Sequence, residues 1–159
     1  MKRALFIIVF GLSVMTSLAQ TASVSVTGNW SSFVPSNTIT EAGNNYNMNL
    51  TSLPNQAFLD IANTNTNTSW SVSVSLQTPM SNGLELYIRK TGDGIGTTGG
   101  SIMPMGTNNF IQLSTMPQVF FQGVKNSTNI PIQCEIRGLS VTAPATTYST
   151  SVVYTISAL

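Results

Sequence analysis

One stretch of the chain matches a known ligand-binding fingerprint, since Gly94-Ile95-Gly96-Thr97-Thr98-Gly99 has the spacing G-x-G-x-x-G. In dinucleotide-binding proteins this spacing follows a strand and opens a helix whose N-terminus meets the pyrophosphate. Here further glycines and a proline interrupt any helix that would follow. The next acidic residue after Asp93 is Glu135, far beyond the expected distance of about 20 residues. We therefore interpret the stretch as a flexible surface loop and expect no bound cofactor.

Side chains that catalyse reactions are scarce. The chain has no histidine, which excludes histidine-based triads, imidazole general bases and the usual zinc sites. Its five carboxylates fall on different expected strands or loops, whereas a glycosidase needs two across a cleft. Asp93 alone offers too few oxygens for calcium. Met103 and Met105 are of a type that binds copper, but we interpret them as packing residues. We expect no catalytic residue and no metal site.

Cys134 is the only cysteine, so no internal disulfide can form. Apolar residues occupy the even positions between Ile130 and Arg137, and a period of two places Cys134 on the core face with Ile132 and Ile136. We predict an inert, buried thiol. A reactive or intermolecular cysteine is the alternative.

Four aromatic side chains are candidates for stacking on a sugar ring, namely Trp30, Tyr46, Trp70 and Tyr87. Trp70 and Tyr46 share the apolar parity of their expected strands, which predicts core positions with the polar atom of each ring hydrogen-bonded. Tyr87 lies on the outward face between Glu85 and Arg89 and is our candidate ligand contact. Cross-strand packing is the alternative role for Tyr87.

Strands must position these residues, because apolar side chains alternate with polar ones from Ser23 onward. The clearest run is 70–76, with four apolar side chains on one face and three serines on the other, solvated face. A turn at 79–83 precedes the run 84–88, which predicts an antiparallel hairpin between the two runs. Further strands are expected at 23–27, 45–50, 57–62, 109–114, 118–123, 130–138 and 146–157. The polar repeat 63–69 is interpreted as a solvated loop or strand entry.

About nine strands joined by loops rich in Gly, Pro, Asn and Ser are typical of a β-sandwich or barrel. We predict an all-β fold, an immunoglobulin-like antiparallel β-sandwich, without helices.

Residues 1–19 have the features of a signal peptide. Lys2 and Arg3 give a positive start, an apolar run follows from Ala4 to Met15, and small residues precede an expected cleavage site before Gln20. Residues 20–159 would then form a single domain. An uncleaved membrane anchor is the alternative, although the apolar run is shorter than the ~20 residues that span a bilayer. We expect export to the extracellular side or outer cell surface, with the periplasm as an alternative.

Charge is also scarce. Only 7% of residues are charged, against about 25% in an average soluble domain. Without residues 1–19 the net charge is about −1. The four remaining cations are scattered, which excludes nucleic-acid binding because phosphate recognition needs several cations on one surface. A surface of hydroxyls and amides has little charge repulsion and suits a protein that packs against neighbours.

The last expected strand carries a Tyr-x-x-x-Val-x-Tyr-Thr pattern at Tyr148, Val152, Tyr154 and Thr155. Together with the stretch FFQGVKNSTNIPIQCEIRGLSV, this C-terminal part resembles small exported bacterial β-sandwich proteins of the spore-coat-U and fimbrial-subunit-like group. The resemblance implies a surface-assembled subunit. Its N-terminal strand, Thr21 to Thr27 with Val24 and Val26, would pair with the sheet of the next molecule. Members of that group commonly carry a disulfide, which this chain lacks, and a self-contained module is equally compatible.

The sequence thus predicts a non-enzymatic structural or adhesive subunit of a bacterial cell surface, which binds copies of itself or other surface proteins. A polysaccharide-binding module, with glycans as partners, is the second hypothesis, and a hydrolase is the third. We expect no cofactor, no nucleic-acid partner and no transmembrane segment in the mature chain.

Overall fold

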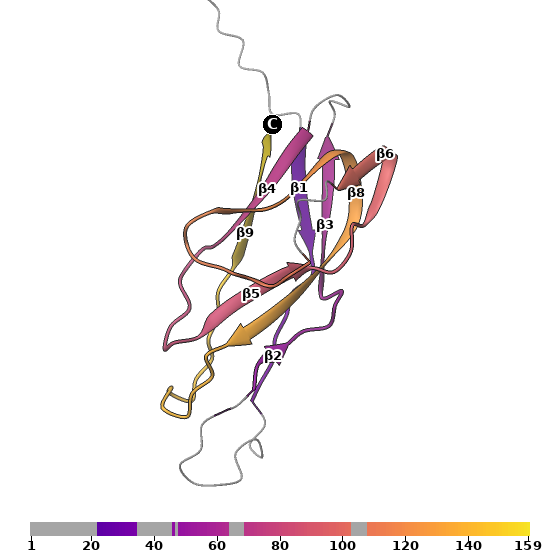
Figure 1. Cartoon of the computed structure of the whole chain (residues 1–159). Coiled ribbons are helices and arrows are strands. Elements are labelled where there is room, and N and C mark those ends of the chain that lie inside the picture. The colour runs from indigo at the N-terminus through magenta and orange to yellow at the C-terminus, as the bar shows by residue number, and fades with distance from the viewer. Residues whose placement is uncertain (1–21, 35–45, 47, 64–68, 103–107) are drawn as a thin grey trace, which may run out of the picture.

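The computed structural model describes residues 22–34, 46, 48–63, 69–102 and 108–159. The expected signal peptide 1–19, Thr21, the centre of the polar repeat at 64–68, and Met103 and Met105 lie outside these ranges. Within them the fold is all-β, antiparallel and without helices, as predicted (Figure 1). None of the described segments forms a helix with the length and hydropathy needed to span a bilayer.

Nine strands are formed by the described residues: β1 (Ala22–Thr27), β2 (Leu50–Thr51), β3 (Ala57–Asn63), β4 (Ser69–Leu76), β5 (Glu85–Lys90), β6 (Ile95–Ile102), β7 (Ile111–Gln112), β8 (Gln118–Arg137) and β9 (Val152–Ala158). The principal order of the sheet is β1-β3-β8-β4-β9. β2, β5 and β6 pair with β8 off this path, and β7 pairs with β5.

β8 organises the fold because it pairs along both of its edges. Gly123 pairs with β4 and with β6, whereas Ile132 pairs with β3 and with β5. Between these two halves, Lys125 and Asn129 have positive φ angles of 56° and 55°, and β8 bends there (Figure 1). The sequence predicted two strands, at 118–123 and 130–138. They are one strand, because the intervening residues stay paired with β6 through the bend.

The two ends of the sheet path approach each other and make the molecule nearly barrel-shaped. Among the described strands, β1 pairs with β3 and β9 pairs with β4, and β1 and β9 lie in contact with each other. No backbone hydrogen bond joins β1 to β9 in the part of the chain that the structure describes. We call this unpaired junction the seam.

The core lies inside the curved sheet, and Trp70 is its largest fully buried side chain. The indole Nε1 donates a 2.7 Å hydrogen bond to the carbonyl oxygen of Lys125, at the bend of β8. The ring meets Phe121 edge-on, with 6.0 Å between centroids. A Cβ atom added at Gly123 would lie 2.4 Å from the indole, so the glycine makes room for the ring. Trp70 is therefore a core residue with a satisfied N–H, as predicted.

The predicted hairpin between 70–76 and 84–88 is wrong. The two strands exist, but β4 lies between β8 and β9, whereas β5 pairs with β7 and β8. The alternation of apolar and polar residues determines which side chains share a face of a strand, but it does not determine which other strand pairs with it. The prediction of a solvated serine face on β4 is also wrong, since Ser71 and Ser75 are buried. Neighbouring strands on both edges cover these small side chains.

The stretch 94–99, interpreted from the sequence as a flexible loop, instead belongs largely to β6. The glycines of β6 let its backbone lie close to that of β8. A Cβ atom added at Gly100 would lie 1.9 Å from the carbonyl oxygen of Asn126 in β8. Three other predicted strands are shorter than expected. Within the run 109–114, Ile111 and Gln112 are in a strand. Of the described residues in 45–50, Leu50 alone is in a strand, and the run 146–157 becomes a strand at Val152.

Candidate functional site

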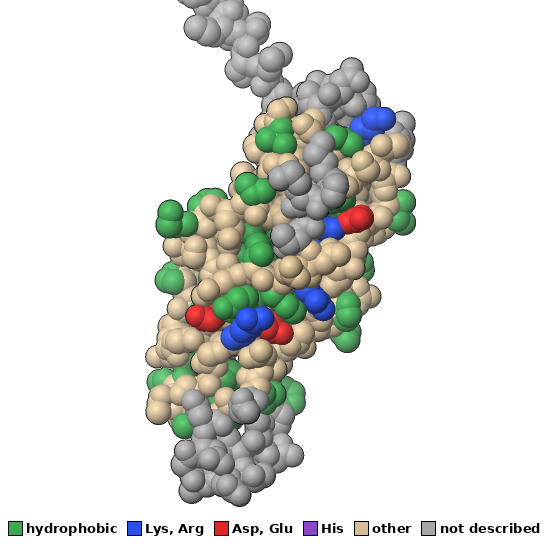
Figure 2. Space-filling view, in the orientation of Figure 1, with side chains coloured by type: hydrophobic (Ala, Val, Ile, Leu, Met, Phe, Trp, Pro, Cys, Tyr) green, Lys and Arg blue, Asp and Glu red, His purple; other side chains and the backbone are tan. Residues whose placement is uncertain are grey.

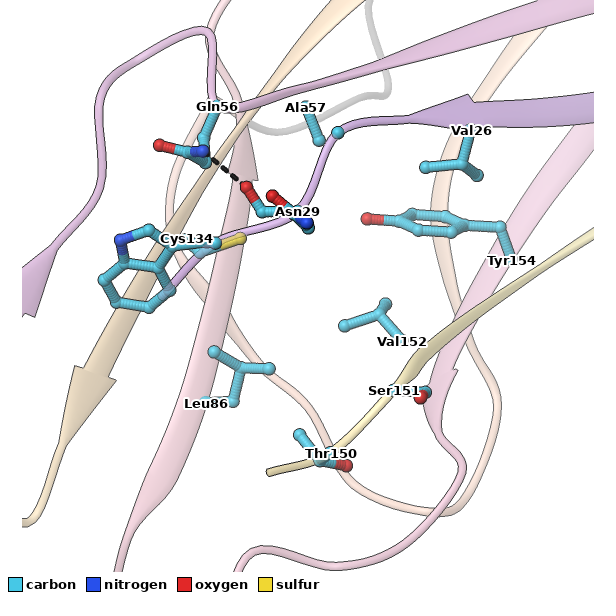
Figure 3. Close-up of a pocket in the computed structure, with 12 residues that line it drawn as sticks. Val26, Asn29, Gln56, Ala57, Leu86, Cys134, Thr150, Ser151, Val152 and Tyr154 are labelled. Carbon is cyan, nitrogen blue, oxygen red and sulfur yellow. Dashed lines mark hydrogen bonds between the residues drawn. The ribbon is translucent and has the colours of Figure 1, made fainter. Parts of the chain in front are cut away.

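A pocket of about 330 Å³ lies where the end of β1 and the beginning of β9 separate along the seam (Figure 3). We call it the seam pocket. Its walls come from the segment after β1, the start of β3, one residue each of β5 and β8, and the start of β9. The lining residues are Val26, Gly28, Asn29, Trp30, Gln56, Ala57, Leu86, Cys134, Thr150, Ser151, Val152 and Tyr154.

The rim on the β1 side depends on a glycine. Gly28 has a φ angle of +112°, and an added Cβ atom would lie 2.6 Å from the carbonyl oxygen of Gln56. This conformation, which L side chains rarely adopt, ends β1 and brings Asn29 beside β3. There the Gln56 side chain donates a 2.5 Å hydrogen bond to the carbonyl oxygen of Asn29 (Figure 3). The rim is thus tied to the residue that precedes β3.

Two ionisable groups point into the seam pocket, the Tyr154 hydroxyl and the Cys134 thiol (Figure 3). Burial raises the pKa of Cys134 from its ordinary value of 9.0 to about 11. Burial, and secondarily the charge of an ionised Cys134, raises the pKa of Tyr154 as well. Both groups are therefore neutral near pH 7. The predicted core-facing position of Cys134 is confirmed, since it packs against the hydrophobic core. The residue is partly buried, however, because it lines the pocket, whereas a buried thiol was predicted.

The lining of this pocket includes polar groups that can still form hydrogen bonds. No hydrogen bond engages the Tyr154 hydroxyl within the described ranges, although its ring packs 6.4 Å from Phe120, centroid to centroid. All twelve lining residues are uncharged. The site therefore combines apolar walls with a few neutral hydrogen-bonding groups.

Val24 and Val26, the candidate strand-exchange residues, lie in β1, which is paired with β3. Val24 is half-buried against the core, whereas Val26 is 45% exposed and lines the seam pocket. Four of the six residues of β1 are exposed. The structure thus brings Val26 together with Cys134 and Tyr154.

Tyr87, the candidate ligand contact, lies elsewhere. Side chains alternate along β5, so Tyr87 faces away from the side on which Leu86 lines the seam pocket. The Arg137 guanidinium lies over the Tyr87 ring, 3.9 Å from its centroid, and the Tyr87 hydroxyl donates a 3.0 Å hydrogen bond to Glu85. Tyr46 and Trp30, the other candidate aromatics, are half-buried. The predicted core position of Tyr46 on a strand is wrong, since this residue lies outside the strands.

Around Tyr87 lies a group of paired side chains that we call the charged face: Glu85, Tyr87, Arg89, Phe110, Gln133, Glu135 and Arg137. Glu135 is buried and accepts hydrogen bonds from Thr51 at 2.9 Å and from Arg137 at 2.6 Å. Arg89 donates to Gln133 at 2.7 Å and lies 4.6 Å from the Phe110 ring centroid. Sequence alternation missed this burial of Gln133 and Glu135, because Thr51 of β2 bonds to Glu135 and the adjacent Ser52 bonds to Gln133 on the outward face of β8.

Charged side chains are sparse in the space-filling view, and blue and red ones lie next to each other near its middle (Figure 2). Lys90, a buried lysine, pairs with the exposed Asp93. No three Cys, Asp or Glu side chains gather into a metal-binding group within the described residues. Comparison of the chain with protein-family models, curated proteins and solved structures finds no match.

Proposed function

We propose that this protein is a non-enzymatic, exported structural subunit of a bacterial cell surface, whose copies assemble by exchanging β1 across the seam. The observation that carries the proposal is the position of β1. Among the described residues it has one hydrogen-bonded neighbour and an unpaired edge along the seam, and four of its six residues are exposed. An edge strand with unpaired backbone groups is a template for pairing with another chain.

The immunoglobulin-like sandwich is part of this proposal. The first half of β8 pairs with β4 and β6, and β9 pairs in turn with β4. The second half of β8 pairs with β2, β3 and β5, and β1 and β7 pair in turn with β3 and β5. This division of partners supports two sheets that are connected through the bend of β8. In such an arrangement β1 and β9 border different sheets, and a strand inserted at the seam would extend either one.

Export and surface location belong to the same proposal. They rest on the signal-like sequence of residues 1–19, which lies outside the described ranges, and on the low charge of the chain. A surface with few charges opposes contact between copies only weakly.

Size-exclusion chromatography of residues 20–159 over a range of concentrations tests assembly. We expect multimers that are lost when residues 20–28 are removed. Because truncation can also impair folding, a second variant keeps β1 in place. Ser23 pairs with Ala62 in the β1–β3 register, so S23C/A62C in a C134A background should lock β1 to its own β3 when oxidised.

The oxidised variant should be monomeric and the reduced variant should assemble like the wild type. Multimers that persist with β1 locked would contradict strand exchange, and a wild type that is monomeric at every concentration would contradict assembly.

A polysaccharide-binding module is the second candidate function. The charged face favours it, because an aromatic ring, two guanidiniums and two carboxylates lie together there and could pair with sugar hydroxyls. Glycan-array binding by monomeric wild type, with loss of signal in Tyr87→Ala, would support this function. An array without signal for either protein would exclude the charged face as a glycan site.

A further inference from the structure

We propose that the seam pocket binds a small, neutral amphiphile, a molecule with a compact apolar body and one hydrogen-bonding group such as an alcohol. This inference concerns the pocket and does not require that β1 be exchanged between copies. Its volume of about 330 Å³ lies at the lower end of the range of roughly 300 to 1,000 Å³ that is typical of ligand pockets.

The walls select an apolar body. Val26, Ala57, Leu86 and Val152 present aliphatic side chains from four different strands, and Trp30 adds an aromatic surface. Transfer of a ligand's apolar surface from water onto such walls is favourable.

The polar groups select one uncharged hydrogen-bonding group. The Tyr154 hydroxyl points into the pocket without a hydrogen-bonding partner in the described part of the chain, and the Cys134 thiol points toward the same space (Figure 3). A ligand oxygen at the Tyr154 hydroxyl would form a hydrogen bond that no side chain or backbone group of the described residues provides. A charged ligand would lose its hydration without gaining an ionic partner, since no lining residue is charged.

The seam provides the entrance. The pocket opens between the end of β1 and the start of β9, which no backbone hydrogen bond joins in the described ranges. A ligand can therefore enter without breaking a ladder between strands.

The native protein offers its own reporter, because Cys134 is the only thiol in the chain. We would measure the rate at which N-methylmaleimide alkylates Cys134 in the presence of 1-octanol, octane or octanoate, and the Tm of the protein with each compound. We expect 1-octanol to slow alkylation several-fold and to raise the Tm. Octanoate should do neither, and Tyr154→Phe should weaken the effect of 1-octanol about fivefold, as expected for one lost hydrogen bond.

A matched pair of variants locates the effect. Val152→Trp fills the pocket and should abolish protection by 1-octanol, whereas Val153→Trp, at a neighbouring position that is 41% exposed, should leave it intact. Circular dichroism checks that both variants fold. If Val152→Trp does not fold, Tyr154→Phe provides the test of the pocket.

Several outcomes would overturn the proposal. Octanoate could slow the alkylation of Cys134 as much as 1-octanol does, or 1-octanol could change neither the alkylation rate nor the Tm. Val153→Trp could lose protection by 1-octanol as completely as Val152→Trp, or Tyr154→Phe could keep the full affinity for 1-octanol. Protection that grows with protein concentration alone would assign the pocket to a second copy of the chain and would likewise overturn it.

Discussion

β1 and β4 contain the same four residues, Ser-Val-Ser-Val, at 23–26 and 71–74, but their surroundings differ. In β4, Val72 and Val74 are 0% and 1% exposed, because β8 and β9 pair with the two edges of the strand. In β1, Val26 is 45% exposed and β3 is the one paired neighbour. The alternating pattern therefore determines that each segment is a strand, whereas its partners determine how much the strand contributes to stability.

This comparison leads to our account of function. β4 is paired along both edges and forms part of the core, whereas we expect β1 to leave the sheet at a smaller cost in free energy. A strand that leaves without unfolding the rest of the domain is what assembly by strand exchange requires. The seam pocket lies at the end of the same strand.

The largest expected loss of stability comes from a substitution in β4 that makes its sequence match that of β1. Trp70→Ala gives β4 the sequence Ala-Ser-Val-Ser-Val, which is identical to residues 22–26. We expect the free energy of unfolding to fall by about 3 to 5 kcal/mol, because a fully buried indole and its hydrogen bond to Lys125 are lost. Urea denaturation measures this change. A loss below about 1 kcal/mol would mean that β4 is no more a part of the core than β1.

The next effect depends on pH and concerns the pocket at the end of β1. The pKa of Cys134 is raised from 9.0 to about 11 in the folded protein, so between these values the unfolded chain loses its proton first. The free energy of unfolding should therefore be unaffected by Cys134 below pH 9 and should fall by about 2 to 3 kcal/mol between pH 9 and 11.

Denaturant titrations at several pH values measure this slope. Cys134→Ala is the control, because it removes the contribution of the thiol and leaves that of Tyr154, which should appear above pH 10. The same slope in wild type and Cys134→Ala would show that the thiol is not buried in the pocket as described.

A matched pair of valines gives a smaller effect. Val74→Ala should cost about 2 kcal/mol, since two buried methyl groups and their contacts are removed. Val26→Ala, in the corresponding position of β1, should cost less than about 0.5 kcal/mol because that side chain is already 45% exposed. Thermal unfolding of both variants checks the difference. Equal costs would mean that β1 is as tightly integrated as β4.

The sequence predicted the parts of the fold that depend on local alternation. β1, β3, β4 and β5 lie within two residues of their expected positions, and Cys134 has the core-facing parity that was expected of it. Period two is a property of each segment alone. That is why the faces of these strands could be read without knowledge of their neighbours.

The remaining features depend on partners far along the chain. β6 was missed because its glycines carry no side chains and therefore show no hydrophobic period, although they approach the backbone of β8 closely. The burial of Glu135 depends on Thr51 and its neighbours, 84 residues away. The seam pocket arises where β1 and β9 meet without pairing. No local sequence pattern predicts that two neighbouring strands will lack backbone hydrogen bonds to each other.

Hydrogen exchange of the backbone amides of β1 and β4 in the monomeric protein tests the central claim most directly. We expect the amides of β1 that bond to β3 to exchange about a hundredfold faster than those at the centre of β4, because β1 opens about 3 kcal/mol more easily than the whole domain unfolds. Equal protection of the two strands would mean that β1 leaves the sheet only when the protein unfolds, and would contradict assembly by exchange of this strand.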